Sequence, residues 1–227
     1  MRPLSGRLAV WDVDRTLTRQ DTLLPFLHDV VGRRAWARLW PRVAADVVRV
    51  GGGRAQLKDE LLRRCLAGRS EAAMEDLADG FAHRVLATGC RPDALARWVW
   101  HRGRGDELAL ASASPGIYVR PLGTLLGAHH VLATDLQVVG GRLTGRRSTP
   151  NCRGEAKARR VADLIAARLR AEVWVYGDSR SDRPSLALAD VPTRVRALRR
   201  LVTPPAIDQA VDPAARAGHG SSSWAWE

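Results

Sequence analysis

Three short apolar runs, each ending in small or acidic residues, constrain the fold of this chain most strongly. They are RLAVWDVD (7–14), ELALASAS (107–114) and AEVWVYGD (171–178). Such runs are typical of parallel strands that are covered on both faces. Patterns with helical spacing follow the second run (115–127) and precede the third (154–170). This alternation predicts an α/β fold with a doubly wound, Rossmann-like parallel sheet, in which ligands bind at the carboxyl ends of the strands.

The segment between the first two runs is too long for a simple crossover connection. We expect it to form a helical cap domain (33–103), inserted into a core domain made of residues 1–32 and 104–203. A β-hairpin is predicted around Gly140-Gly141, and the Pro-, Ala-, Ser- and Gly-rich tail (204–227) is predicted to be disordered. The cap prediction rests on three apolar stripes: Trp36, Leu39, Trp40, Val43, Val47 and Val50; Leu57, Leu61, Leu62, Cys65 and Leu66; and Met74, Leu77, Phe81 and Val85.

Composition excludes several classes of protein. The 227 residues contain 45% hydrophobic and 26% charged residues, as an ordinary globular protein does. No apolar run approaches the roughly 20 residues that a membrane span needs, and no signal-peptide core is present, so a cytoplasmic location is expected. The three cysteines, Cys65, Cys90 and Cys152, are widely spaced and odd in number. They fit neither a disulfide framework nor a zinc site.

The formal charge of +12 does not by itself indicate nucleic-acid binding, because arginine provides all but two of the 36 basic residues. A preference for arginine at nearly every basic position is a bias of the whole composition and does not point to a particular ligand. The excess is nevertheless uneven, because residues 33–69 hold ten basic and three acidic residues. The stretch RRAWARLWPRVAADVVRV (33–50) could meet an anionic membrane surface. Packing of its apolar stripe within the cap, with the arginines in solvent, is the favoured interpretation.

Carboxylates follow two of the predicted strands. Asp12 and Asp14 lie at the end of the first run, and Asp178 ends the third. Because like charges this close need a counter-charge, and because all the donors are oxygens, we expect a Mg²⁺ site. Lys157 lies in the first turn of a predicted helix, where anions are favoured, and Ser112 ends the second strand. Together these groups would form a cradle for one phosphoryl group.

Four motifs in this order resemble those of the haloacid dehalogenase-like phosphatases. They are DVDRT (12–16), Ser112 in ASASP, Lys157 in NCRGEAK, and GDSRSD (177–182). Their spacing is similar to that of the subfamily I enzymes with a helical C1 cap between motifs one and two, a group that includes phosphoserine phosphatase. The resemblance covers most of residues 7–195.

The resemblance implies roles for the carboxylates. Asp12 would be the nucleophile that forms an aspartyl-phosphate. Asp14 would protonate the departing alcohol and then activate the hydrolytic water. Mg²⁺ would be held by Asp12, by the main-chain carbonyl of Asp14 and by Asp178, with Asp182 supporting the metal directly or through water.

The resemblance also assigns the phosphate-binding residues. Ser112 and Lys157 would bind the phosphoryl oxygens, and Thr16 would steady the nucleophile loop through a hydrogen bond. A lysine at position 157 is informative in a chain that uses arginine at all but two of its basic positions, because ammonium and guanidinium groups are not interchangeable at such a site.

The sequence departs from phosphoserine phosphatases around the substrate. Those enzymes have glutamate where Asp21 stands, asparagine at Ser181 and glycine at Ala113. These differences weaken a phosphoserine assignment but leave the hydrolytic residues intact. Asp21 and Arg180 are candidate substrate contacts.

The sequence therefore predicts a Mg²⁺-dependent phosphomonoester hydrolase of a small phosphorylated metabolite, without a nucleic-acid partner. One alternative is a phospholipid head-group phosphatase, of the phosphatidylglycerophosphate type, at the membrane surface. A second is a non-catalytic protein that binds anions or nucleic acid. The Asp12/Asp14 pair argues against the second alternative and against dehalogenation, because an alkoxide leaving group needs an acid and a halide does not.

Overall fold

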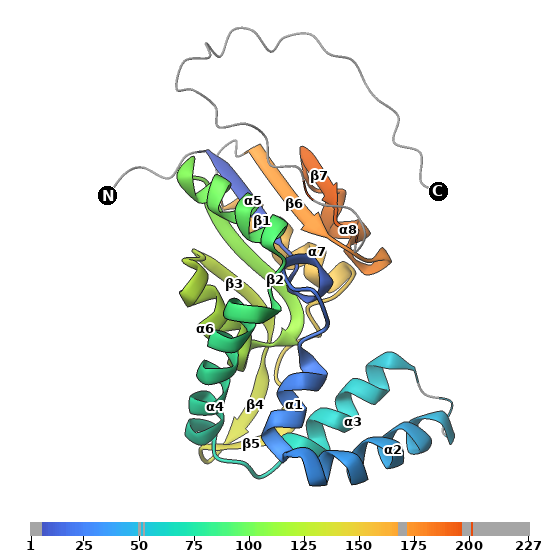
Figure 1. Cartoon of the computed structure of the whole chain (residues 1–227). Helices are drawn as coiled ribbons and strands as arrows, with labels where there is room; N and C mark the ends of the chain where they lie inside the picture. Colours follow the sequence, from blue (N-terminus) through green and yellow to red (C-terminus); the bar gives the residue numbers. More distant parts are fainter. Residues whose placement is uncertain (1–5, 50, 52, 168–171, 197–200, 202–227) are drawn as a thin grey trace, which may run out of the picture.

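A five-stranded parallel sheet forms the centre of the computed structural model, which describes residues 6–49, 51, 53–167, 172–196 and 201 (Figure 1). The strand order is β3-β2-β1-β6-β7, so β1 is the middle strand. This confirms the predicted α/β class. The strands are β1 (Arg7–Trp11), β2 (Glu107–Pro115), β3 (His130–Thr134), β6 (Glu172–Gly177) and β7 (Val191–Arg194).

Both faces of the sheet are covered, which explains the apolar runs of the sequence. Leu8 and Val10 of β1 pack with Val161 and Leu186 on one face. Trp11 packs on the other face, 5.9 Å from Trp98 between ring centroids. Because the strands are buried on both faces, they have no solvent-facing positions at which polar residues would alternate with apolar ones. The helices that carry these contacts are α5 (Pro92–Gly103) and α6 (Gly116–Leu126) on the Trp11 face, with α7 (Glu155–Ala166) and α8 (Arg183–Leu186) on the opposite face.

A second group of helices lies beyond the carboxyl ends of the strands, where Figure 1 shows α1, α2 and α3 below the sheet. The predicted hairpin is confirmed, since β4 and β5 pair antiparallel on either side of Gly140-Gly141. The hairpin packs against α3, and α4 packs against α6. The bounds are α1 (Leu23–Val31), α2 (Arg33–Arg49), α3 (Arg54–Leu66), α4 (Glu71–Arg84), β4 (Leu136–Val139) and β5 (Arg142–Arg147).

The exact limits of a cap domain stay a prediction. Within the segment 33–103, α5 lies against the sheet through Trp98, whereas α1, which precedes the segment, packs against α2, α3 and α4. The tail 204–227 lies outside the described residues. Across the described parts of the chain, no helix has both the length and the apolar character to cross a membrane.

The strand order also fixes where a ligand would bind. Chain connections run from β1 to β2 on one side, while β6 returns to the opposite side of β1. The carboxyl ends of β1 and β6 therefore flank the point at which the strand order reverses, the usual ligand position in an open α/β sheet. Asp12 and Asp178 directly follow these two strands.

Candidate active site

The loop after β1 presents Asp12 in a buried position. The Asp12 backbone N–H donates to the carbonyl of Tyr176 at 2.9 Å, which extends the pairing of β1 with β6 by one residue. The Thr16 hydroxyl donates to Asp12 Oδ2 at 3.0 Å, so Thr16 steadies this carboxylate directly. Arg15, in the same loop, has a φ of 62°, a left-handed conformation that costs a non-glycine residue energy. Strain of this kind concentrates at functional loops.

Lys157 joins two of the predicted site carboxylates. Its Nζ donates to Asp12 Oδ1 at 2.6 Å and to Asp182 Oδ1 at 2.7 Å, and only 4% of the residue is exposed. The side chain comes from the first turn of α7, which begins at Glu155. Gly154 precedes it with φ 58° and ψ −134°, a combination that a residue with a Cβ adopts only with strain. The loop before α7 therefore depends on glycine to place Lys157.

Asp12, Asp178 and Asp182 form a cluster of carboxylates. One oxygen from each lies within 4.8 Å of the others. Asp182 comes close because the residue at the end of β6 is Gly177, where a Cβ would lie only 2.5 Å from the Asp182 Cβ. Arg15 Nε approaches Asp178 Oδ2 at 3.5 Å from the exposed side.

Burial and Lys157 act in opposite directions on Asp12. Burial is the larger influence and raises the pKa of Asp12 to about 7, while Lys157 lowers it and the Asp182 and Asp14 charges add to the rise. Burial also works against the charge of Lys157, but the two bonded carboxylates outweigh it and raise the Lys157 pKa. One ammonium therefore leaves negative charge in the cluster incompletely balanced.

The two remaining carboxylates differ. Burial raises the pKa of Asp178, and Arg15 opposes that rise only in part. Burial acts the same way on Asp182, but Lys157 and hydrogen bonds from Ser179 outweigh it and lower the Asp182 pKa. The cluster thus offers three hard oxygen donors, and for Asp12 and Asp178 the neighbouring groups do not offset the cost of burying the charge. A divalent cation would relieve that cost, so the residues fit Mg²⁺.

The Asp14 side chain has a different set of partners. Asp14 Oδ1 accepts from the Thr22 backbone N–H at 2.7 Å and from the Thr22 hydroxyl at 2.6 Å. Asp14 Oδ2 accepts from the Ser114 hydroxyl at 2.6 Å. The hydroxyl oxygens of Thr22 and Tyr118 lie 3.1 Å apart, within hydrogen-bond distance. Sequence reasoning did not identify Thr22 or Ser114 as site residues. Ser114 carried a signal, because it lies two positions after Ser112 and alternate residues of a strand share a face.

Ser112 is fully buried at the irregular end of β2, where the register with β3 shifts between Ala111 and Pro115. Its Oγ accepts from the Ser114 backbone N–H at 3.0 Å. Because β2 and β1 are neighbours in the sheet, Ser112 and Asp12 lie at the same edge. The structure thus brings the predicted phosphate-binding serine to the strand end beside the loop that carries Asp12.

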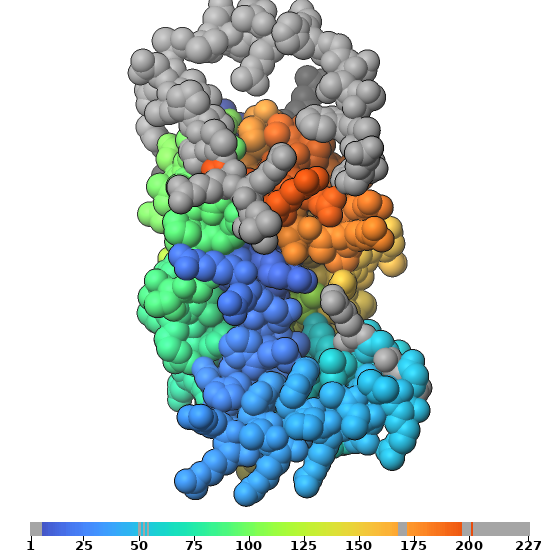
Figure 2. All heavy atoms as spheres, turned by 45° about the vertical axis from the view of Figure 1, so that its right-hand side comes forward, coloured from blue at the N-terminus to red at the C-terminus, as the bar shows by residue number. Residues whose placement is uncertain are grey.

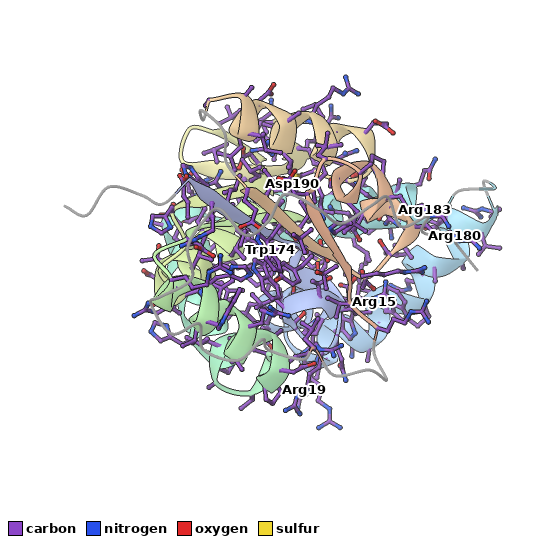
Figure 3. The ribbon with its side chains drawn as sticks, turned by 90° about the horizontal axis from the view of Figure 1, so that it is seen from above. Arg15, Arg19, Trp174, Arg180, Arg183 and Asp190 are labelled. Carbon is purple, nitrogen blue, oxygen red and sulfur yellow. The ribbon has the colours of Figure 1, made fainter. Side chains whose placement is uncertain are left out.

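The two candidate substrate contacts lie in different places. Asp21 accepts from the Leu23 backbone N–H at 3.0 Å and lines the same pocket as Asp14. Arg180 is exposed, lies with Arg183 toward the outer edge of the molecule (Figure 3), and is not among the residues that line this pocket. A substrate contact for either residue stays a prediction, and the geometry favours Asp21.

The pocket beside Asp14 has a volume of about 490 Å³ and lies between the sheet edge and α1, α2 and α3. Lys58 of α3 reaches into it and donates to the Ala113 carbonyl and, at 2.9 Å, to Asn151 Oδ1. Burial, followed by the nearby Arg147, lowers the pKa of Lys58 to about 8. Lys58 was not among the predicted site residues. Its only signal in the sequence was that lysine is rare in this chain.

Comparisons with known proteins place the chain among phosphatase-like hydrolases. The profile of the haloacid dehalogenase-like hydrolases matches residues 9–187. Protein CicA of Caulobacter vibrioides is 33% identical over 200 residues, covering 83% of this chain and 88% of CicA. A probable phosphatase of Mycobacterium tuberculosis is 26% identical over 194 residues, covering 81% of this chain and 67% of the relative.

Among solved structures, a phosphoserine phosphatase holding a phospho-aspartyl intermediate analogue superposes with a TM-score of 0.58 at 17% identity. The match covers 81% of this chain and 83% of that one. At this identity the likeness shows a shared fold alone.

Proposed function

Because this chain belongs to the haloacid dehalogenase-like hydrolases, we propose that it is a Mg²⁺-dependent phosphomonoesterase that works through an aspartyl-phosphate. The observation that carries the proposal is the position of Lys157, whose ammonium bonds Asp12 on one side and Asp182 on the other. A buried cation beside a nucleophilic carboxylate and a metal-fitting cluster is an arrangement suited to phosphoryl transfer.

The metal would be held by Asp12 and Asp178, with Asp182 as a further or water-mediated ligand and the Asp14 carbonyl as the predicted main-chain ligand. When bound, it would neutralise charge on the phosphoryl oxygens and on Asp12. Asp182 also holds Lys157 in place through its 2.7 Å hydrogen bond. Changes at Asp182 should therefore affect both phosphate binding and metal binding.

In the first step Asp12 attacks phosphorus, the ester P–O bond breaks, and Asp14 gives its proton to the departing alkoxide. Asp14 lines the pocket, so the alcohol can leave on that side. Lys157 and Ser112 would bind the phosphoryl oxygens during the transfer. Thr16 holds Asp12 through its hydroxyl, which restricts the carboxylate to one orientation.

In the second step a water molecule gives a proton to Asp14 and attacks the aspartyl-phosphate. Inorganic phosphate is released and both carboxyl groups return to their starting states. The hydroxyls of Thr22 and Ser114 fix the Asp14 side chain through both steps. Division of one displacement into two explains why the chain needs a nucleophile and a separate acid–base residue.

The substrate we propose is a small phosphorylated compound. Support for phosphatase activity comes from the relative in Mycobacterium tuberculosis described as a probable phosphatase. Phosphoserine itself is not favoured, because Asp21 stands where those enzymes have glutamate. We propose that residues 33–103 act as the cap that selects the substrate, since α2 and α3 form one side of the pocket.

A second candidate is a head-group phosphatase at a membrane surface, and one observation favours it. Five arginines of α2 are exposed, namely Arg33, Arg34, Arg38, Arg42 and Arg49. In Figure 2, α2 forms the lower front of the molecule with side chains projecting from it. Co-sedimentation with anionic vesicles tests this candidate: salt-sensitive binding is expected if it is right, and recovery in the supernatant contradicts it.

The proposed activity is tested with a panel of phosphorylated metabolites, with phosphate release measured in Mg²⁺ and in EDTA. We expect Mg²⁺-dependent release from at least one ester and none from the Asp12→Asn variant. Release that is equal in EDTA, or that persists in the variant, contradicts the proposal. The folding of the variant is checked by circular dichroism.

A further inference from the structure

The pocket beside Asp14 has an apolar wall made by three helices. Leu24 of α1, Trp40 of α2 and Leu57 of α3 all line it, and all three are only half-buried. Ala55, at the start of α3, is exposed at the same wall. Apolar area that is left in contact with water gains free energy when a ligand covers it. Three helices therefore leave apolar surface that a ligand could cover beside Asp14, the proposed acid–base residue.

Three of the charged groups of this pocket have protein partners, and two arginines, Arg15 and Arg153, line it as well. Asp14 accepts hydrogen bonds from Thr22 and Ser114, and Lys58 donates to Ala113 and Asn151. Asp21 accepts from Leu23. A polar substrate group that bound Asp14, Lys58 or Asp21 would have to compete with these internal bonds. The apolar wall, in contrast, has unused capacity to bind a ligand.

We infer that the alcohol of the substrate carries an apolar group several carbons long, such as an alkyl or acyl chain, which binds against Leu24, Trp40 and Leu57. This inference rests on the proposed phosphatase function and narrows its substrate class to amphiphilic phosphomonoesters. A pocket of about 490 Å³ is within the usual size range of small-molecule sites. Asp14, beside which the leaving oxygen would lie, is one of its lining residues.

The test is a series of n-alkyl phosphates from ethyl to octyl, each below its micelle concentration, with phosphate release measured in Mg²⁺. We expect kcat/KM to rise about two- to fourfold for each added methylene until the wall is filled. A kcat/KM that is constant or falls along the series overturns the inference while leaving the phosphatase proposal standing. Failure of every ester to release phosphate overturns both.

Variants of the wall residues test whether the dependence of kcat/KM on chain length arises at the apolar wall. Trp40→Ala should flatten the dependence of kcat/KM on chain length. Because Trp40 stacks on Trp36 and its loss could unfold α2, Ala55→Glu provides a second variant at an exposed position, where a carboxylate should oppose chain binding. Val48→Ala is the matched control, since Val48 is 76% exposed on α2 and does not line the pocket. It should keep the full dependence on chain length.

An amphiphilic ester could come from solution or from a bilayer, and the same chemistry serves both. Octyl phosphate as a monomer and a long-chain phosphomonoester in vesicles separate the two sources. Hydrolysis of either, with the loss of chain-length dependence in Ala55→Glu, supports the inference. An unchanged dependence in both Trp40→Ala and Ala55→Glu overturns it.

Discussion

Lys157 Nζ lies 2.6 Å from Asp12 Oδ1, and this contact connects the first turn of α7 to the carboxyl end of β1. The two residues are 145 positions apart in the sequence and are both buried. Their charges are placed where a phosphoryl group in transit would need both a nucleophile and a counter-charge. The predictions that follow start from this pair.

Lys157→Arg should lower kcat by about 10²-fold or more, because a planar guanidinium cannot take the place of a compact ammonium between two carboxylates. Steady-state kinetics on the best ester of the metabolite panel checks this. Arg159→Lys, on the exposed side of the same helix, is the matched control and should keep wild-type rates. Wild-type kcat in Lys157→Arg would contradict the assigned contact with phosphate.

Asp14→Asn should lower kcat by about 10²- to 10⁴-fold, because an amide can neither protonate the alkoxide nor take a proton from water. The loss should be smaller for an ester with an acidic alcohol, such as p-nitrophenyl phosphate, whose leaving group needs little protonation. Rates are compared for that ester and for an alkyl phosphate. Equal losses for the two esters would count against Asp14 as the acid.

Ser114→Ala should lower kcat by about 10-fold or more, because it removes one of three hydrogen bonds to Asp14, and a bond to a charged group contributes about 1.5–3 kcal/mol. Ser114→Thr keeps the hydroxyl and should restore most of the activity. Binding of inorganic phosphate, measured by calorimetry, should be nearly unchanged in Ser114→Ala. Weaker phosphate binding with unchanged kcat would show that Ser114 acts on phosphate instead.

Burial raises the pKa of Asp12 from 3.8 to about 7 in the metal-free protein. Between these two pKa values, the folded protein keeps a proton on Asp12 that the unfolded chain has already lost. Asp12 therefore makes the free energy of unfolding fall as the pH rises through this range. Denaturant unfolding in EDTA should show a larger loss of stability between about pH 5 and about pH 8 for wild type than for Asp12→Asn. Equal losses would contradict the raised pKa.

Mg²⁺ binding needs the carboxylates deprotonated, so the ion should stabilise the wild-type protein more at about pH 8 than at about pH 5. Asp178→Asn should lose most of this stabilisation. Ser181→Ala, beside the cluster but with its hydroxyl bonded to Ser179, should retain it. Stabilisation that is independent of both pH and Asp178 would place the ion elsewhere.

Much of the sheet and of the cluster follows from local sequence patterns. The short apolar runs predict strands buried on both faces, and neighbouring parallel strands must bring Asp12 and Asp178 to one edge. Asp182 follows too, because the turn after β6 is short and Gly177 allows close approach. These relations depend on a few adjacent residues and on the regular geometry of a sheet.

The pocket could not be predicted in the same way. The position of Lys58 depends on how α3 packs against the hairpin. This packing is close, because a Cβ added to Gly145 of the hairpin would lie 2.6 Å from the Cα of Arg63 in α3. The partners of Asp14 depend on where α1 begins and on the irregular end of β2. Apolar stripes in 33–103 predict helices but not their orientation over the sheet. Tertiary packing decides that orientation, and with it which side chains face the site.

The central claim is that Asp12 carries the phosphoryl group, and rapid-quench mass spectrometry tests it most directly. The protein would be mixed with Mg²⁺ and its best ester, quenched in acid within a turnover, digested and sequenced. One added phosphoryl group on Asp12 is predicted, accumulating further in Asp14→Asn because hydrolysis of the intermediate is slowed. Continued turnover with Asp12 unmodified, or with the label on another residue, would contradict the account.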